Sequence, residues 1–188
     1  GPGTGKTTVV HALLDIFDSM GLDAALAAPT GRAAKRLSEA TSHEARTVHR
    51  LLEAEYDGTE ENGSVIGRRL SFRRCEKELL DEHVIIIDEA SMLDSALTAA
   101  LLRAIKPGAR LIIIGDSDQL PSVGAGNVLH DIIDSGVFAT VCLTEIFRQA
   151  QRSLIVTNAH AIDRGEMPVL DVKDRDFFFL PRSSDAEI

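Results

Sequence analysis

The sequence predicts an α/β fold, a mostly parallel sheet with helices on both faces, and three observations support this prediction. First, apolar runs of strand length occur at 24–28, 84–87, 111–114 and 140–143. Second, the runs at 84–87 and 111–114 contain only Val, Leu and Ile, as expected of parallel strands buried on both faces. Third, helix-like segments separate the runs, and this alternation is typical of a doubly wound sheet.

Length and composition are those of one globular domain with its own core, since the chain has 188 residues, 44% hydrophobic and 26% charged. The sequence holds no run long enough to span a bilayer and no basic-then-apolar leader, so we expect a soluble chain without a membrane partner. Cys75 and Cys142 show no metal-site spacing, and a disulfide framework is not expected. A reducing cytoplasm fits this cysteine usage.

Charge is unevenly distributed along the chain. The net charge of −9 by itself argues against a basic nucleic-acid-binding face. Basic residues nevertheless cluster in two places, at Arg32, Lys35 and Arg36 and at Arg68, Arg69, Arg73 and Arg74. Solvated surface charge is the default interpretation of such clusters, and a local basic groove is the alternative.

Helices are expected between the strands. In the segment 7–20 apolar residues recur at close to helical spacing, and Gly21 stands where a C-terminal glycine belongs. Further helix-like segments are 33–40, 95–105 and 126–135.

Two segments depart from this alternation. The polar, glycine-containing stretch 53–77 is too long for a simple connection and predicts an inserted hairpin, with a strand over 65–72 paired across a turn at 58–63. Near the end of the chain, 177–180 is expected to be another strand, followed by a helix start at Ser184 and Asp185.

The first residues, GPGTGKTT, match the end of the phosphate-loop pattern G-x-x-x-x-G-K-[ST], whose leading glycine would precede Gly1. Glycines let the backbone curl so that successive N–H groups point at phosphate oxygens, and the helix that follows directs its positive end at the anion. Lys6 would reach the β- and γ-phosphates, and Thr7 would ligate Mg²⁺. A chance glycine-rich turn is the alternative. The predicted nucleotide-binding residues are Gly3, Thr4, Gly5, Lys6, Thr7 and Thr8.

Polar side chains follow the two most apolar strands. Asp88 and Glu89 come directly after 84–87, at the edge where ligands bind in open α/β sheets. There Asp88 is suited to hold Mg²⁺ and Glu89 to accept a proton from the attacking water. A helix cap is the competing interpretation, and both apply because Ser91 and Asp94 can cap the next helix.

Gln119 follows the next strand in the segment GDSDQ. A neutral amide both donates and accepts hydrogen bonds, which suits a sensor of the γ-phosphate or the water. A surface loop is the alternative. Arg148, in LTEIFRQA, could bring positive charge to the γ-phosphate in the transition state, or it could be an ordinary surface arginine.

The phosphate loop is followed, in order, by APTGRAAKRL, TVHRLLE, IIIDEASMLD, GDSDQLPSVGAGNVL and LTEIFRQ. Together these segments closely resemble superfamily 1 helicases of the 5′→3′ class, specifically RecD-like enzymes such as the exodeoxyribonuclease V alpha subunit and TraA-type relaxases. The resemblance covers residues 1 to about 168. It implies a RecA-like P-loop NTPase fold, ATP and Mg²⁺ as cofactors, and a bacterial cytoplasmic location. It assigns nucleotide roles to Lys6, Thr7, Asp88, Glu89, Gln119 and Arg148.

The same resemblance implies contacts to single-stranded DNA or a duplex junction. The insertion 53–77 falls where such helicases carry a pin that splits the duplex. Tyr56 and Phe72 are its only aromatic residues, so the sequence leaves open whether the pin has an aromatic wedge that stacks on bases. The implied DNA-contacting residues are Thr30, Gly31, Arg32, Thr47, His49 and Arg50.

The resemblance also implies a domain organisation. Residues 1–168 would form the first motor domain, and 169–188 would begin the link to a second motor domain that this chain lacks. We expect the isolated chain to hydrolyse ATP weakly. The strand before the phosphate loop is absent too, so its neighbours should close up or 177–180 should fill its slot, unless upstream residues supply it.

Several alternatives for function and parent protein stay open. A nucleotide- or DNA-binding switch without turnover competes with the helicase, whereas a nuclease rests on the family name alone. The parent is a stand-alone helicase, a RecBCD subunit with RecBC-type partners, or a relaxase fusion.

Overall fold

The computed structural model describes residues 4–57, 60–61, 64–65, 69–143, 152–172 and 176–180. The chain forms two compact units, one of Gly1–Lys6 with Cys142–Ile188 and one of Thr7–Val141.

A four-stranded parallel sheet in the order β2-β1-β7-β8 organises the larger unit. The predicted strands 24–28 and 84–87 are confirmed at the same bounds as β1 and β7, and the run at 111–114 corresponds to β8, shifted by one residue. The fourth strand, β2, was not predicted. The strands are β1 (Ala24–Ala28), β2 (Ala45–Thr47), β7 (Val84–Ile87) and β8 (Arg110–Ile113).

Helices cover both faces of this sheet, as the alternating pattern predicts. On one face α1 (Lys6–Ser19) and α2 (Gly31–Thr41) pack on Leu26, Val84 and Ile86. On the other face α3 (Val48–Leu51) and α4 (Ser95–Ala104) pack on Ala27, Ile85 and Ile87. Successive residues of β1 and β7 thus serve opposite faces, which explains why the whole strand has to be apolar.

Turns and caps end the helices where the sequence indicates. Gly21 follows α1 with a φ of +67°, the left-handed conformation that favours glycine. A 3-10 helix, η1 (Ala90–Met92), follows β7, and α5 (Val128–Asp134) is shorter than the predicted helix over 126–135.

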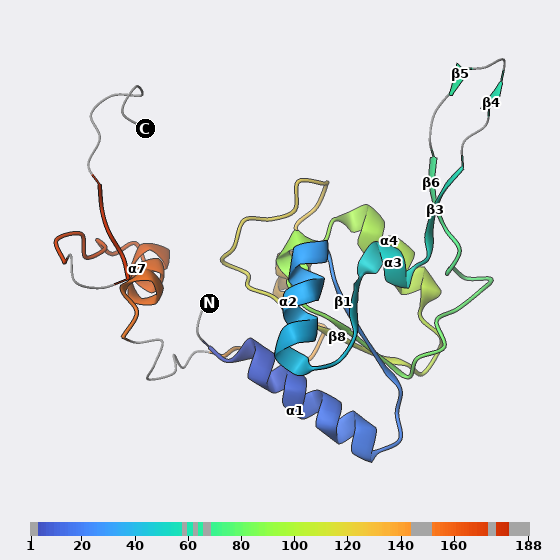
Figure 1. Cartoon of the computed structure of the whole chain (residues 1–188), viewed down its shortest axis with the longest axis horizontal. Helices are drawn as coiled ribbons and strands as arrows, with labels where there is room; N and C mark the ends of the chain where they lie inside the picture. The colour runs from blue at the N-terminus through green and yellow to red at the C-terminus, as the bar shows by residue number, and fades with distance from the viewer. Residues whose placement is uncertain are drawn as a thin grey trace. The chain divides into compact units, whose positions relative to one another are not determined.

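The insertion is a hairpin, as predicted, and it leaves the core directly after α3 (Figure 1). β3 (Ala54–Asp57) pairs antiparallel with β6 (Arg69–Phe72), and beyond them β4 (Glu60–Glu61) pairs with β5 (Ser64–Val65). The single strand expected over 65–72 is therefore two strands, β5 and β6.

Two expected strands are wrong. Residues 140–143 and 177–180 have no strand structure, and side chains such as Val141 and Leu180 are exposed. An apolar run becomes a strand only when a neighbouring strand pairs with it, and neither run has such a partner among the described residues. Each strand of the sheet is hydrogen-bonded directly to the next in the order, so residues 177–180 do not lie between any two of them.

The smaller unit contains a helix that was not predicted, α7 (Leu154–Asp163). Ser153 caps its start by accepting from Val156 N at 3.2 Å, and Asp176 accepts a hydrogen bond from Leu154 N at 2.7 Å. The hydrogen bond that Ser153 donates to Asp176 lowers the pKa of that carboxyl. Across the part of the chain that the structure describes, no helix has the length and apolar character to cross a membrane.

Candidate functional site

The phosphate loop leads into α1 with the expected backbone. Gly5 has a φ of +83°, a conformation that requires glycine, and Lys6 is the first residue of the helix. The first turn of α1 carries no acidic residue that would offset the positive end of the helix. Thr7 and Thr8 are exposed on this turn, and Thr4 is buried. Gly3 lies outside the described residues.

Asp88 and Glu89 lie at the carboxyl end of β7, and backbone hydrogen bonds tie the chain there to both neighbouring strands. The N–H of Asp88 donates to Ala27 O at 2.9 Å, and the N–H of Ala90 donates to Ile114 O at 2.9 Å. Both carboxyl side chains are half-buried. The structure thus holds the two predicted acidic residues in a fixed place at the sheet edge where ligands of α/β proteins bind.

Glu89 has an unusual backbone conformation. Its φ of +53° and ψ of +39° lie in the left-handed region, which costs a non-glycine residue about 1 kcal/mol. The side chain makes no capping hydrogen bond to η1, so capping does not explain the conformation. Backbone strain of this kind is often found at functional sites, and it favours the chemical role over the cap.

Gln119 contacts the turn that follows Glu89. Its Oε1 accepts a hydrogen bond from the hydroxyl of Ser91 at 3.3 Å, with Ser91 buried and Gln119 exposed. The expected cap of α4 is therefore half right, because Asp94 accepts from Leu97 N at 2.7 Å whereas Ser91 binds Gln119 instead. Sequence reasoning missed this Ser91–Gln119 bond between residues 28 positions apart.

Gly115 explains how the two turns come so close. A Cβ at this position would lie 2.6 Å from Leu129 Cδ2 and 3.2 Å from the backbone nitrogens of Ala90 and Ser91. The backbone at the end of β8 therefore packs directly on η1. The following loop is packed in the same way, since a Cβ at Gly124 would overlap the Asp94 side chain.

The predicted DNA-contacting threonines begin two helices at the same sheet edge. Thr30 accepts a hydrogen bond from Ala33 N at 3.2 Å and caps α2, and Thr47 accepts from Arg50 N at 3.1 Å and caps α3. Both hydroxyls thus have a structural role, and each keeps its proton for a further bond. The side chains of Arg32 and Arg50 are exposed beside these caps.

His49 contacts the hairpin. Its ring lies 6.0 Å from the ring of Phe72 in β6, tilted by 46°, and it is half-buried. The structure therefore gives His49 a packing role between α3 and the base of the hairpin, which the sequence did not indicate.

Arg73 and Arg74 are ion-paired, which favours the surface-charge interpretation of their cluster. Arg74 Nε donates to Glu53 Oε1 at 2.8 Å, and Arg73 lies 3.3 Å from the other oxygen of the same carboxylate. The hydrogen bond with Arg74 lowers the pKa of Glu53 and raises that of Arg74. Arg68 and Arg148 lie outside the described residues.

The residues present fit a Mg²⁺ ion held mainly by phosphates and water. The described residues contain no group of three or more His, Cys, Asp or Glu side chains that could hold a metal ion. Mg²⁺ in nucleotide sites commonly takes only one or two protein ligands, and Thr7 and Asp88 are of the right chemical type.

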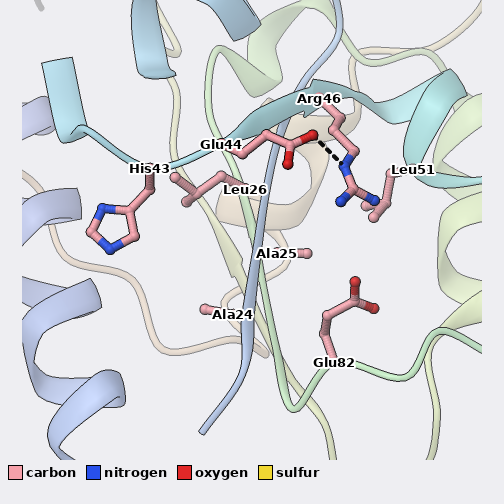
Figure 2. Close-up of a pocket in the computed structure, with 8 residues that line it drawn as sticks. All are labelled: Ala24, Ala25, Leu26, His43, Glu44, Arg46, Leu51 and Glu82. Carbon is pink, nitrogen blue, oxygen red and sulfur yellow. Dashed lines mark hydrogen bonds and ion pairs between the residues drawn. The ribbon is translucent and has the colours of Figure 1, made fainter. Parts of the chain in front are cut away.

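A pocket of about 230 Å³ lies away from these residues (Figure 2). Its lining comes mainly from the amino ends of β1 and β2 and from Glu82, just before β7. Figure 2 shows the Glu44–Arg46 ion pair, at 3.1 Å, on one wall of it. Since ligands of open α/β sheets bind at the carboxyl ends of the strands, this pocket is not the predicted nucleotide site.

Comparisons with known proteins agree with the motifs. The AAA domain family matches residues 1–178. The chain is 42% identical over 168 residues to the ATP-dependent RecD2 DNA helicase of Deinococcus radiodurans, covering 89% of this chain and 21% of that protein. It is 40% identical over 191 residues to the RecBCD enzyme subunit RecD of Mycobacterium tuberculosis, covering 88% and 31%. It thus spans between about a fifth and a third of these relatives.

Solved structures of Pif1 helicases show the same fold. Bacteroides Pif1 bound to single-stranded DNA matches with a TM-score of 0.52 and 22% identity, covering 88% of this chain and 41% of that one. A structure of two coordinating Pif1 helicases at forked duplex DNA matches with a TM-score of 0.53 and 22% identity, covering 93% and 46%. These likenesses confirm the RecA-like α/β fold.

Proposed function

The chain belongs to the AAA domain family and is a homologue of the RecD helicases. From this premise we propose that residues 1–168 are the ATP-binding first motor domain of an ATP-dependent 5′→3′ DNA helicase acting in recombination, repair or conjugation. The observation that carries the proposal is the turn after β7, where Asp88 and the strained Glu89 are anchored to both neighbouring strands.

The proposed roles of the phosphate loop and of the turn after β7 follow the helicase motifs in the sequence. The N–H groups of the loop and the Lys6 ammonium hold the phosphates, and Thr7 and Asp88 would hold Mg²⁺. When bound, the metal would supply positive charge that offsets the negative charge of the phosphates. Glu89 accepts the proton of the attacking water, and Arg148 stabilises negative charge on the transferred group.

Gln119 would sense the γ-phosphate and pass its state to the rest of the domain. Its hydrogen bond to Ser91 supports this role, because Ser91 belongs to the turn that directly follows Glu89. A change in the contacts of Gln119 would therefore reach the general base through Ser91, two residues further along the chain.

Single-stranded DNA would bind at the carboxyl ends of β1 and β2, through Thr30, Gly31, Arg32, Thr47, His49 and Arg50. Exposed arginines beside two helix starts suit phosphate contacts. The hairpin inserted in 53–77 would act at the duplex junction. The second motor domain in cis, following the link 169–188, and RecBC-type subunits are the proposed partners, in a bacterial cytoplasm.

A switch that binds nucleotide without turnover is the alternative function. Strain at Glu89 favours the enzyme, since a site that only binds nucleotide has no need of a held general base. The isolated chain should hydrolyse ATP weakly, because the proposed second motor domain supplies half of the site.

The test uses the full-length protein with wild-type and Lys6→Ala forms, on duplexes carrying either a 5′ or a 3′ single-stranded tail. The wild type should hydrolyse ATP faster with single-stranded DNA present and unwind only the 5′-tailed duplex. Lys6→Ala should bind ATP weakly and unwind neither substrate. ATP binding by the wild type without hydrolysis would support the switch, and unwinding from a 3′ tail would contradict the assigned polarity.

A further inference from the structure

The base of the hairpin carries a network that the proposed function does not use. The polypeptide turns sharply as it leaves α3, since Glu53 has a φ of +51°. Across the base, Arg73 N donates to Glu53 O at 3.2 Å and Arg74 N donates to Leu52 O at 3.1 Å. The two strands are therefore joined by backbone bonds where they meet the core.

The side chain of Arg74 connects three segments at this point. Its Nε donates to Glu53 Oε1 at 2.8 Å, at the start of the hairpin. Its Nη1 donates to Leu79 O at 3.0 Å and lies 3.3 Å from Asp81 Oδ2, in the segment that leads into β7. That segment is itself fixed to the core, because Leu80 is buried and its N–H donates to Ala104 O at 2.8 Å.

Arg73, its neighbour, has a more local role. It lies 3.3 Å from Glu53 and 3.1 Å from Glu78, but Glu78 belongs to a tight turn closed by backbone bonds with Cys75. The Arg73 side chain is 57% exposed, whereas that of Arg74 is 22% exposed. An ion pair with less solvent around it is screened less, so Arg74 should contribute more to the geometry than Arg73.

The contacts on the other side of the hairpin lead back to the proposed DNA site. Phe72 packs against the core cluster and contacts His49 of α3. α3 is the helix that Thr47 caps and that carries the exposed Arg50. The base of the hairpin is thus held both by α3 and by the segment that leads into β7.

We propose that Arg74, with Glu53 as its acceptor, is a positioning residue that holds the hairpin in a fixed direction relative to α3 and β7. This inference rests on the proposed helicase function. In this proposal, separation of the DNA strands depends on a hairpin held rigidly at the duplex junction. ATP hydrolysis does not depend on the position of the hairpin. Loss of the Arg74 contacts should therefore lower the rate of DNA unwinding without lowering the rate of ATP hydrolysis.

The experiment compares Arg74→Gln with Arg73→Gln in the full-length protein, measuring unwinding of a 5′-tailed duplex and DNA-stimulated ATP hydrolysis. Arg74→Gln should unwind about tenfold more slowly, because misplacement of a positioned group has costs of this order or larger. Its ATP hydrolysis should stay within about twofold of the wild type, and Arg73→Gln should stay within about twofold in both assays.

A second variant and a second measurement guard against a trivial loss of folding. Glu53→Gln removes the carboxylate that pairs with Arg74, and with it the pair to Arg73, and should show the same separation of the two activities. Hydrogen exchange should become faster at the amides of 54–57 and 69–72 in both variants, with the amides of β7 unchanged.

Each outcome bears on the inference. Unwinding at the wild-type rate in Arg74→Gln and Glu53→Gln overturns it and leaves the helicase function intact. Equal losses of unwinding and hydrolysis also overturn it, since the residues would then support the whole domain. A wild-type protein that does not unwind DNA overturns both this inference and the proposed function.

Discussion

The carboxyl ends of two strand pairs in the same sheet use their polar residues in different ways. At β1 and β2, threonine hydroxyls are occupied in capping helices, and exposed arginines stand beside them. At β7 and β8, the backbone holds the turn, Glu89 stays in a left-handed conformation without capping, and Gln119 reaches the same turn through Ser91. The carboxyl ends of β1 and β2 (the β1–β2 edge) consist mainly of helix starts. At the carboxyl ends of β7 and β8 (the β7–β8 edge), the backbone holds a few side chains in place.

Topology therefore locates a site but does not determine its chemistry. All four strands are parallel, and each of β1, β2 and β7 leads into a helix. The left-handed backbone of Glu89 and the tight packing at Gly115 indicate that side chains at the β7–β8 edge are held in fixed positions. We therefore propose nucleotide chemistry at the β7–β8 edge and DNA binding at the β1–β2 edge.

The largest predicted effect that separates the edges is the loss of hydrolysis in Glu89→Gln. Removal of a general base should lower the rate of ATP hydrolysis by about 100-fold to 10,000-fold while ATP binding persists. Steady-state hydrolysis and equilibrium nucleotide binding in the full-length protein measure the two quantities. Glu82→Gln is the matched control, since this glutamate lies before the amino end of the same strand. Hydrolysis that survives in Glu89→Gln would show that the base lies elsewhere.

Adding one methyl group should change the free energy of unfolding differently at the two edges, and the larger of these changes is of intermediate size. Gly115→Ala should lower the free energy of unfolding by about 1–3 kcal/mol, because its Cβ would overlap Leu129 and press on the backbone of η1. Gly31→Ala meets no atom within 4 Å and should be neutral or stabilising by up to about 1 kcal/mol. Denaturant unfolding measures both. Equal effects would mean that the β8–η1 contact is looser than described.

The smallest effect is expected at the helix cap on the β1–β2 edge. Thr30→Ala should lower the free energy of unfolding by about 1 kcal/mol, and Thr30→Ser should restore most of it, because serine retains the capping oxygen. Thermal unfolding of both variants measures this. If Thr30→Ala also lost DNA affinity and Thr30→Ser kept it, the hydroxyl would have a second role in DNA binding. Unchanged stability in Thr30→Ala would contradict the capping role.

Much of the sheet could be predicted from the sequence, since uninterrupted apolar runs, of Ala and Leu in β1 and of Val and Ile in β7, identified both strands at their observed bounds. The same criterion failed at 140–143 and 177–180, because an apolar run does not reveal whether a partner strand exists. It also missed β2, which has three residues with an arginine in the middle. Short elements depend on their neighbours more than on their own composition.

The motif residues could be placed from the sequence, but their contacts could not. Asp88 and Glu89 lie where the motif places them, at the end of β7. The Ser91–Gln119 and Glu53–Arg74 bonds join residues 28 and 21 positions apart, and no local pattern indicates either pair. These contacts arise only when the parallel strands and the hairpin bring the segments together.

The proposed division between nucleotide chemistry at one edge and DNA binding at the other can be tested by measuring two quantities in two variants of the full-length protein. These are the affinity for single-stranded DNA and the rate of ATP hydrolysis at saturating DNA, in Glu89→Gln and Arg32→Ala. We predict that Glu89→Gln loses hydrolysis and keeps its DNA affinity, whereas Arg32→Ala loses DNA affinity and keeps its rate at saturation. Loss of both quantities in both variants would contradict the division.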